Sequence, residues 1–365
     1  MNNTSSVVSV FWNKRLAGQL ALTPEGRCAF EYDPAFVSNG ASLSPFFLPL
    51  RQELFIAKAT PFSGGFGVFD DSLPDGWGQL LLDRYLRSVG VDVRRLTILQ
   101  RLSLVGSNGR GALEYAPDKS VFAEYSGSDL HVISNEIQEI LSGKDDKISL
   151  EELYVRGGSH GGARPKIFYR HDGKEWLVKF QASNDPANIG ETEYRYSLLA
   201  KKCGIEMPET RLFENTYFGV ERFDRTLADH KIHVHSAAGM LHADYRIPSL
   251  DYIDLLKLCR YITSNMEEVK KLFRQMIFNV VIENKDDHAK NFAFIYSDNR
   301  WKLSPAYDLL PSDGFNGFHT TTVNGNGLPT SDDMLFAGKE VDLNLSTCRQ
   351  IIDEVTDICG DITIT

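Results

Sequence analysis

The feature that most constrains the fold is a long amphipathic segment that ends in a run of polar residues. From Met266 to Glu283 apolar residues recur at helical spacing, which predicts a helix with one buried face. Directly after it, Asp286 and Asn291 stand five positions apart. A further aspartate, Asp308, follows two strand-like runs separated by a turn. A rigid helix that delivers its chain into a polar loop is a typical scaffold for reactive side chains.

The order Asp-x-x-x-x-Asn followed by a distal Asp is the layout that protein kinases use. Phosphoryl transfer needs charge to be positioned more than it needs covalent chemistry. In this interpretation Asp286 orients the attacking hydroxyl, while Asn291 and Asp308 bind Mg²⁺. His288 and Lys290 lie between them and are available to phosphate oxygens. A capped turn at the end of a helix is the alternative, so the kinase interpretation depends on further elements upstream.

A glycine-rich stretch, residues 157–162, directly precedes a predicted hairpin. Backbone N–H groups in such a stretch can approach phosphates closely. Ser159 places a hydroxyl at the tip of this loop, where it would lie over a γ-phosphate. It is not a Walker A motif, because the Gly-Lys-Ser/Thr ending is absent. A flexible surface loop remains the alternative.

Two apolar runs around an Asp-Gly turn, within residues 166–180, predict a β-hairpin. Lys179 lies on its second strand, as does the kinase lysine that neutralises the non-transferred phosphates. A solvated lysine on an edge strand is the ordinary alternative. Glu193, in the next predicted helix, is a candidate partner for Lys179, and Glu191 competes for that role.

The segment from Glu221 to Arg225 follows a strand and precedes a loop. It could be the hinge between two lobes, with its backbone at an adenine edge, or a salt-bridged surface turn. A group of histidines nearby raises a metal hypothesis, although no cysteine or paired carboxylate completes a tetrahedral set. These histidines are His230, His233, His235 and His242.

A chain of 365 residues is long enough for two or three domains. We expect a β-rich subdomain over residues 1–117, a glycine-loop and strand-lysine region over 118–225, and a mainly helical region over 226–365. A formal net charge of -10 argues against a surface built to bind nucleic acid.

Five widely spread cysteines without a Cys-x-x-Cys pair indicate reduced, mostly structural thiols. The first twelve residues lack the pattern of a secretory signal, and nowhere do eighteen apolar residues run together. We therefore expect a soluble, cytoplasmic protein.

Several of these segments together resemble the HipA family of toxin serine/threonine kinases, the kinase half of type II toxin–antitoxin modules. Its core motifs are similar to residues 159–166, 221–225, 286–291 and 305–308. Its leading β-rich subdomain is similar to residues 11–18, 73–76 and 109–113. Longer members of the family continue further beyond Asp308, so we expect part of the carboxyl lobe to be short.

The resemblance implies an α+β, bilobal protein-kinase-like fold, the cofactors ATP and Mg²⁺, and Asp286 as catalytic base. It implies that autophosphorylation of Ser159 silences the enzyme through the added charge. The residues that would line the nucleotide site are Gly161, Gly162, Ala163, Arg164, Pro165, Lys166, Lys179, Glu221, Arg222, Phe223, His288, Lys290, Asn291, Tyr307 and Asp308.

The resemblance also implies a protein target in translation, such as an aminoacyl-tRNA synthetase. The implied partner is a small helix-turn-helix antitoxin of the HipB kind, through which alone the chain would meet DNA.

Two other functions compete with an active kinase. One is a nucleotide-binding corepressor subunit that acts with a DNA-binding antitoxin and performs little chemistry. The retained set of Asp286, Asn291 and Asp308 favours activity, because a structural module need not keep like charges around a cation site. The other is a metal-dependent phosphoesterase, which leaves Lys179 and the glycine-rich stretch without a role. Its residues would be Asp286, Asp287, His288 and Asp308.

Overall fold

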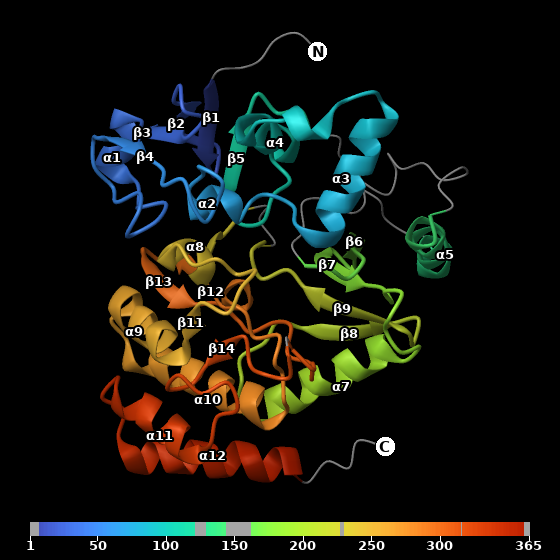
Figure 1. Cartoon of the computed structure of the whole chain (residues 1–365), viewed down its shortest axis with the longest axis vertical. Helices are drawn as coiled ribbons and strands as arrows, with labels where there is room; N and C mark the ends of the chain where they lie inside the picture. The colour runs from blue at the N-terminus through green and yellow to red at the C-terminus, as the bar shows by residue number, and fades with distance from the viewer. Residues whose placement is uncertain (1–6, 121–128, 144–161, 227–229, 315, 361–365) are drawn as a thin grey trace. The chain divides into compact units, whose positions relative to one another are not determined.

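The computed structural model describes residues 7–120, 129–143, 162–226, 230–314 and 316–360. It has the α+β class that the sequence predicts, with a β-rich amino-terminal region and a mainly helical carboxyl-terminal part (Figure 1). The chain divides into two compact units. The first unit comprises Met1–Glu191 and Glu209–His233, and the second comprises Thr192–Pro208 and Val234–Thr365. The expected boundaries at residues 117 and 225 stay a prediction.

The first unit opens with an antiparallel sheet of five strands in the order β4-β3-β2-β1-β5. Apolar and polar residues alternate along its strands, so one face is buried. A two-residue turn with positive φ at both Asn13 and Lys14 joins β1 to β2, as hairpin twist favours. The strands are β1 Val7–Trp12, β2 Arg15–Leu22, β3 Cys28–Tyr32, β4 Leu54–Ile56 and β5 Leu113–Ala116.

Helices cover the buried face of this sheet and continue the unit. Phe30 of β3 packs against Phe69 with ring centroids 5.5 Å apart, and Tyr115 of β5 joins them. Thr97 begins one helix with a reciprocal capping box, a typical start signal. The helices are α1 Pro34–Asn39, α2 Gly67–Asp70, α3 Gly76–Ser88, η1 Val93–Arg95, α4 Ile98–Val105 and α5 Leu130–Leu141.

A second antiparallel sheet, in the order β6-β7-β9-β8, completes the first unit. The predicted Asp-Gly hairpin is confirmed: Asp172 and Gly173 both have positive φ and join β6 to β7. One face of this sheet is buried, because Ile167, Trp176 and Val178 pack into a core with α3 and α5. The strands are β6 Lys166–His171, β7 Lys174–Lys179, β8 Thr210–Phe213 and β9 Tyr217–Glu221.

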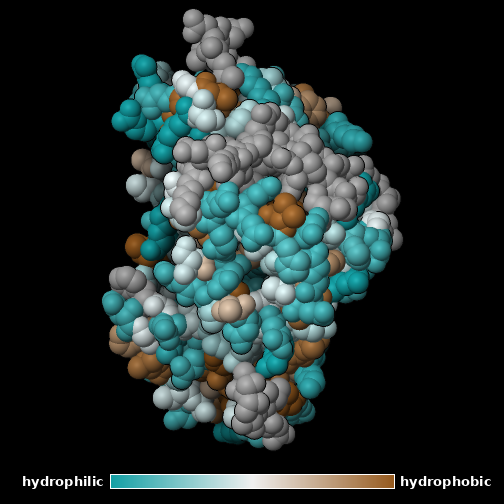
Figure 2. Space-filling model, turned by 90° about the vertical axis from the view of Figure 1, so that its right-hand side faces the viewer, coloured by the Kyte–Doolittle hydropathy of each residue, from teal (hydrophilic) through white to brown (hydrophobic). Residues whose placement is uncertain are grey.

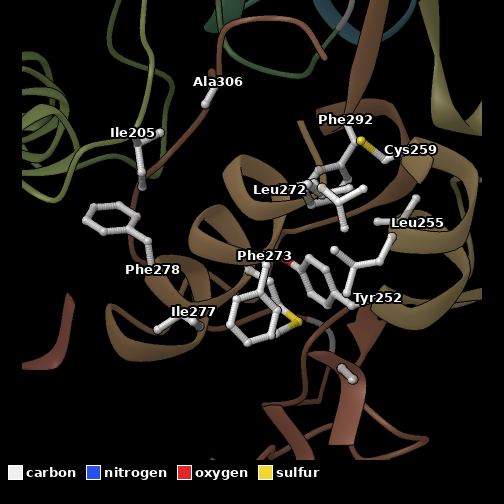
Figure 3. Packing of buried hydrophobic residues seen from close by; sticks show 14 of the residues in the cluster. Ile205, Tyr252, Leu255, Cys259, Leu272, Phe273, Ile277, Phe278, Phe292 and Ala306 are labelled. Atoms are coloured by element: carbon white, nitrogen blue, oxygen red, sulfur yellow. The ribbon is translucent and has the colours of Figure 1, made fainter. Parts of the chain in front are cut away.

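Helices dominate the second unit. The long amphipathic helix predicted from the sequence is present, and its apolar face forms the centre of the core. Figure 3 shows Leu272, Phe273 and Tyr252 pointing into that core. The helices are α7 Ile189–Lys202, which begins in the first unit, α8 Ala237–Leu241, α9 Tyr252–Thr263, α10 Met266–Val281, η3 Ala289–Asn291, α11 Ser331–Lys339 and α12 Leu345–Gly360.

Short strands frame the polar loop that follows α10. A sheet in the order β10-β12-β13 contains the two strand-like runs that the sequence predicts before Asp308. A parallel pair joins β11 to β14. The strands are β10 His233–Ser236, β11 Leu250–Asp251, β12 Ala293–Ser297, β13 Arg300–Leu303 and β14 Thr321–Thr322.

Among the described residues, no helix combines the length and the apolar character needed to cross a membrane. On the face that Figure 2 shows, hydrophobic residues are scattered among hydrophilic ones, which is normal for a protein surface. All five cysteines are free, and four of them are buried.

Replacing a ring at the centre of the second unit tests this core. We expect Phe273→Ala to lower the free energy of unfolding by about 3–5 kcal/mol, because a fully buried ring leaves a cavity. The matched control is Tyr261→Ala, since that ring is 71% exposed and should change stability by only about 0.5 kcal/mol. Urea denaturation measures both. Equal effects would mean that α10 does not form this core.

Candidate active site

In the first unit, two buried lysines face each other across the β6–β7 hairpin. Lys166 and Lys179 are cross-strand partners, so their side chains leave the same face of the sheet. They are 4% and 8% exposed, and the Lys179 ammonium lies 5.6 Å from the centroid of the Phe218 ring. Lysine binds phosphate as a point charge, so two ammonium groups on one sheet face are suited to a phosphate chain.

Half-buried apolar side chains lie beside these lysines on the same sheet face. Phe168 pairs with Leu177, and Leu177 pairs in turn with Val220 on β9. The Arg222 guanidinium lies 4.0 Å from the centroid of the Phe168 ring. A flat apolar surface next to cationic groups fits a planar base that carries phosphates. Sequence reasoning missed this patch, although the alternation of residues along the strands could have indicated it.

The glycine-rich stretch is described only at its end. Ser159 and Gly161 lie outside the described residues, so their predicted roles stay predictions. The Gly162 N–H donates to the Asp75 carboxylate, and its carbonyl oxygen accepts from the Trp77 N–H at 3.0 Å.

The residues after Gly162 connect the stretch to β6. Ala163 is exposed, whereas Pro165 is buried and its carbonyl oxygen accepts from the Phe180 N–H at 2.8 Å. The Arg164 guanidinium donates to both carboxylate oxygens of Asp185, at 3.0 and 3.1 Å. The predicted nucleotide contacts of these residues are untested, and Arg164 has an evident structural role.

The turn from Glu221 to Arg225 is the centre of a buried ion-pair network. Asp224 is 5% exposed and accepts from Arg222 at 2.8 Å and from Arg225 at 2.9 Å. Its carboxylate also accepts from the Gly111 N–H at 2.8 Å. Of the two interpretations left open, a salt-bridged turn describes these side chains, but the bridge is buried rather than on the surface.

Other predicted nucleotide contacts in this turn are also engaged with protein. The Glu221 carboxylate accepts from Lys174 at 2.9 Å. The Arg222 N–H donates to the carbonyl oxygen of Glu175 at 2.9 Å. Contacts of Glu221, Arg222 and Phe223 with a nucleotide stay predictions.

Charge keeps the Asp224 carboxyl ionised. Burial alone raises its pKa, but the positive charges of Arg222 and Arg225 outweigh burial and hold the pKa well below its usual range. Burial, and then the charge of Arg222, lowers the pKa of Arg225 to about 10. Asp224 and Arg225 therefore both stay charged at neutral pH.

In the second unit, hydrogen bonds give the Asp286–Asn291 loop a fixed shape. The Asn291 side-chain amide donates to the carbonyl oxygen of Asp286 at 2.7 Å, so the five-residue spacing closes a ring. The Asn284 amide donates to the carbonyl oxygen of Asp308 at 3.1 Å. Tyr307 adds a bond from its hydroxyl to the carbonyl oxygen of Lys290 at 2.7 Å. The loop and the distal aspartate, far apart in the sequence, are therefore brought together.

Asp287, the neighbour of Asp286, is fully buried and anchors the loop. Its carboxylate accepts from the Tyr252 hydroxyl at 2.9 Å and from the Thr321 N–H at 3.1 Å, and His319 Nδ1 lies 2.8 Å away. Burial, together with the charge of Asp287, raises the pKa of Tyr252 well above its usual value, so the phenol remains a donor. Asp286, by contrast, is exposed.

Sequence reasoning missed these partners of Asp287, because nothing in the local pattern marks them. They lie about 30 residues away on either side, in α9 and around β14.

Two aromatic contacts complete the loop. The Lys290 ammonium lies 4.1 Å from the centroid of the Tyr245 ring, and the His288 ring centroid lies 6.1 Å from it. A cation above an aromatic face is held there electrostatically. Tyr245 therefore helps to orient the two residues predicted to face phosphate oxygens.

The choice between Glu191 and Glu193 as the partner of Lys179 stays open. Glu191 belongs to the first unit, and Glu193, which is buried, belongs to the second.

The hypothesis that the histidines bind a metal ion is not supported. His233 Nε2 lies 2.9 Å from the carbonyl oxygen of Leu43. Within the described part of the chain, no three His, Cys, Asp or Glu side chains group to hold a metal ion.

Comparison with known proteins identifies the family. Residues 8–116 match the HipA N-terminal domain, and residues 158–361 match the HipA-like C-terminal domain. The chain therefore belongs to the HipA family, as its motifs predicted.

Two curated relatives from Sinorhizobium fredii bear the names "Putative kinase Y4dM" and "Putative kinase Y4mE". The first is 28% identical over 329 residues, which are 82% of this chain and 76% of that protein. The second is 28% identical over 341 residues, which are 84% of this chain and 77% of that protein.

A solved structure shares the fold. It is HipA of Shewanella oneidensis MR-1, in a complex with HipB and its operator DNA. The match has a TM-score of 0.73 and 18% identity, and it covers 96% of this chain and 88% of that one.

Neutralising Asp224 tests the buried network. Asp224→Asn leaves two buried arginines without their carboxylate, so we expect unfolding at pH 7 to become easier by about 3–5 kcal/mol. In the unfolded chain Asp224 binds a proton near its usual pKa of 3.8, and in the folded protein only at lower pH. The stabilisation is therefore complete at neutral pH and lost as pH falls below that value.

Guanidinium unfolding at pH 7 and at about pH 3 measures the effect, and the difference between wild type and variant should shrink at the lower pH. Asp92→Asn is the control, because Asp92 is partly exposed and pairs only locally with Arg94. A pH-independent difference would show that the charge of Asp224 is not what stabilises the network.

Proposed function

We propose that this HipA-family protein is an ATP- and Mg²⁺-dependent serine/threonine protein kinase. The observation that carries the proposal is the closed loop of the second unit, in which hydrogen bonds bring Asp286, Asn291 and Asp308 together. The buried lysine pair of the first unit supplies the cationic surface that a triphosphate needs.

Asp286 would act on the protein substrate. It accepts the hydroxyl proton of a serine or threonine while the oxygen forms its bond to the γ-phosphorus of ATP. The bond between that phosphorus and the β,γ-bridging oxygen breaks, and ADP leaves. The exposure of Asp286 supports this role, and its anchored neighbour Asp287 keeps the loop from moving away.

The residues predicted to hold Mg²⁺ fit that ion. The amide nitrogen of Asn291 donates to the Asp286 carbonyl oxygen, so its amide oxygen would be the atom that binds the cation. Asp308 offers a carboxylate, and its backbone is fixed by Asn284. Amide and carboxylate oxygens are the hard ligands that Mg²⁺ prefers, and the bound ion would neutralise charge on the phosphates.

On the first unit, Lys166 and Lys179 would neutralise the non-transferred phosphates. The base would lie on the apolar patch formed by Leu177 and Val220. His288 and Lys290 of the second unit would contact phosphate oxygens.

We also propose regulation, a target class and a partner. Phosphorylation of Ser159 would add about two negative charges next to the phosphate site and silence the enzyme.

The target would be a cytoplasmic translation component, such as an aminoacyl-tRNA synthetase. HipB accompanies the Shewanella protein on its operator, which supports a small HipB-like helix-turn-helix antitoxin here. The net charge of -10 is consistent with DNA contact only through that partner.

A corepressor with little catalysis is the competing function, and one substitution separates the two. We expect Asp286→Asn to lower phosphoryl transfer by about 10²–10⁴-fold, because it removes the proton acceptor. The full chain is incubated with Mg-ATP, with and without candidate protein substrates, and phosphosites are mapped by mass spectrometry. Asp298→Asn is the control, since that carboxylate lies in the exposed β12–β13 turn.

Phosphate on Ser159 or on an added protein, lost in Asp286→Asn only, supports the kinase. If ATP binds but no residue gains phosphate, the corepressor is the better description. Hydrolysis of a simple phosphate ester without ATP would instead favour a phosphoesterase.

The lysine pair gives a second test. We expect Lys179→Met to raise the KM for ATP by about tenfold or more, because a charge-assisted bond to phosphate is lost. Lys174→Met is the matched control: Lys174 lies on the same strand, but its side chain leaves the opposite face and pairs with Glu209 and Glu221. Initial rates at varied ATP concentration measure both. An equal or larger effect from Lys174→Met would contradict a specific role of Lys179 in binding ATP.

A further inference from the structure

The start of helix α3 contacts the end of the glycine-rich stretch within the first unit. Asp75, Gly76 and Trp77 come from the amino-terminal HipA domain, whereas Gly162 belongs to the HipA-like C-terminal domain. The segment that contains Asp75 resembles a family motif, but the proposed catalytic cycle gives it no role.

Two hydrogen bonds run in opposite directions across this contact. The Gly162 N–H donates to Oδ1 of Asp75, and the Trp77 N–H donates to the carbonyl oxygen of Gly162 at 3.0 Å. Both backbone polar groups of Gly162 therefore bond to the start of α3. Gly162 cannot donate this N–H to a phosphate while it is held by Asp75, which differs from the cradle that its glycine-rich context predicted.

The Asp75 side chain does not make the capping hydrogen bond that its position favours. It occupies the N-cap of α3, where an aspartate usually accepts from backbone N–H groups of its own first turn. No such side-chain capping bond is present, and the carboxylate bonds to Gly162 instead. A first-turn donor, the Trp77 N–H, is satisfied by Gly162 in return. The first turn of α3 therefore binds the backbone of Gly162 instead of capping itself.

The two glycines at this contact have steric reasons to lack a side chain. Gly76 has a φ of +47°, and a Cβ there would collide with the carbonyl oxygen of Gly162. Gly162 has a φ of +93°, and a Cβ there would lie 2.6 Å from the Lys166 ammonium nitrogen. At Gly76 the clash would be with backbone, so only glycine lets α3 approach Gly162 this closely. At Gly162 the positive φ itself favours glycine, and an added Cβ would displace the Lys166 ammonium.

We propose that Asp75 is a positioning residue for phosphate binding, which acts through Gly162 on Lys166. Asp75 accepts from the Gly162 N–H, and the Trp77 N–H bonds the Gly162 carbonyl oxygen. The Gly162 backbone held in this way lies against the Lys166 ammonium, and Lys166 pairs across the hairpin with Lys179. The amino-terminal HipA domain is in this way part of the support of the nucleotide site. The inference rests on the proposed kinase function, because it assumes that the lysine pair binds the phosphates of ATP.

The test is the dissociation constant for Mg-ATP, measured by calorimetry on the full chain. All variants carry Asp286→Asn as well, so that phosphorylation does not intervene. We expect Asp75→Ala to weaken binding by about tenfold, the usual effect of losing a hydrogen bond to a charged group. Asp75→Asn keeps an acceptor oxygen for the Gly162 N–H and should bind within about threefold of the parent.

Two further variants separate positioning from simple stabilisation. Gly162→Ala places a side chain at a φ of +93° and displaces the Lys166 ammonium, so it should also weaken binding, and it carries the test if Asp75→Ala does not fold. Asp92→Ala removes another carboxylate of the same unit, one that caps η1, and should leave binding unchanged. Thermal unfolding of each variant, followed by circular dichroism, shows whether a loss of binding merely reflects a loss of fold.

The outcomes are distinct. Folded Asp75→Ala protein, or folded Gly162→Ala protein in its place, that binds Mg-ATP as tightly as the parent would overturn the inference and leave the kinase proposal intact. Equal weakening by Asp75→Asn and Asp75→Ala would show that the acceptor bond is not the cause. If the parent protein itself does not bind Mg-ATP, the proposed function fails and the inference fails with it.

Discussion

The buried carboxylate of Asp224 joins segments of the first unit that lie far apart in the sequence. An ionised group can stay in a protein interior only if opposite charges and hydrogen-bond donors surround it. Arg222 and Arg225 supply the charge, and the Gly111 N–H supplies a further donor. Arg225 also donates to the carbonyl oxygens of Gly109 and Gly111. The turn after β9 and the loop before β5 are therefore fixed to each other.

The second unit uses the same physics around Asp287. This carboxylate is fully buried and accepts from Tyr252 and Thr321, and it contacts His319. In both units the buried aspartate supports a neighbouring segment rather than facing solvent. Asp286, one position away, is exposed. A rigid anchor next to an exposed carboxylate would support the precise placement that the proposed catalytic role of Asp286 requires.

Local patterns predicted much of the fold, because they reflect local physics. The Asp172-Gly173 hairpin formed because both residues accept positive φ. The helix before the Asp286–Asn291 loop formed because its apolar residues repeat at 3.6-residue spacing and its first turn is capped by Asn265. The motifs at residues 159–166, 221–225, 286–291 and 305–308 resemble those of the HipA family, and the domain matches confirm that membership.

By itself, the sequence determined the secondary structure around the site and the identity of its candidate reactive groups, Asp286, Asn291 and Lys179. Only the tertiary structure decided what supports them: the partners of Asp287 and the contact of Asp75 with Gly162. These contacts join residues separated by up to about 90 positions, and no periodicity or spacing encodes such a pair. They arise because each buried polar group must find a partner, and the folded chain decides which one is near.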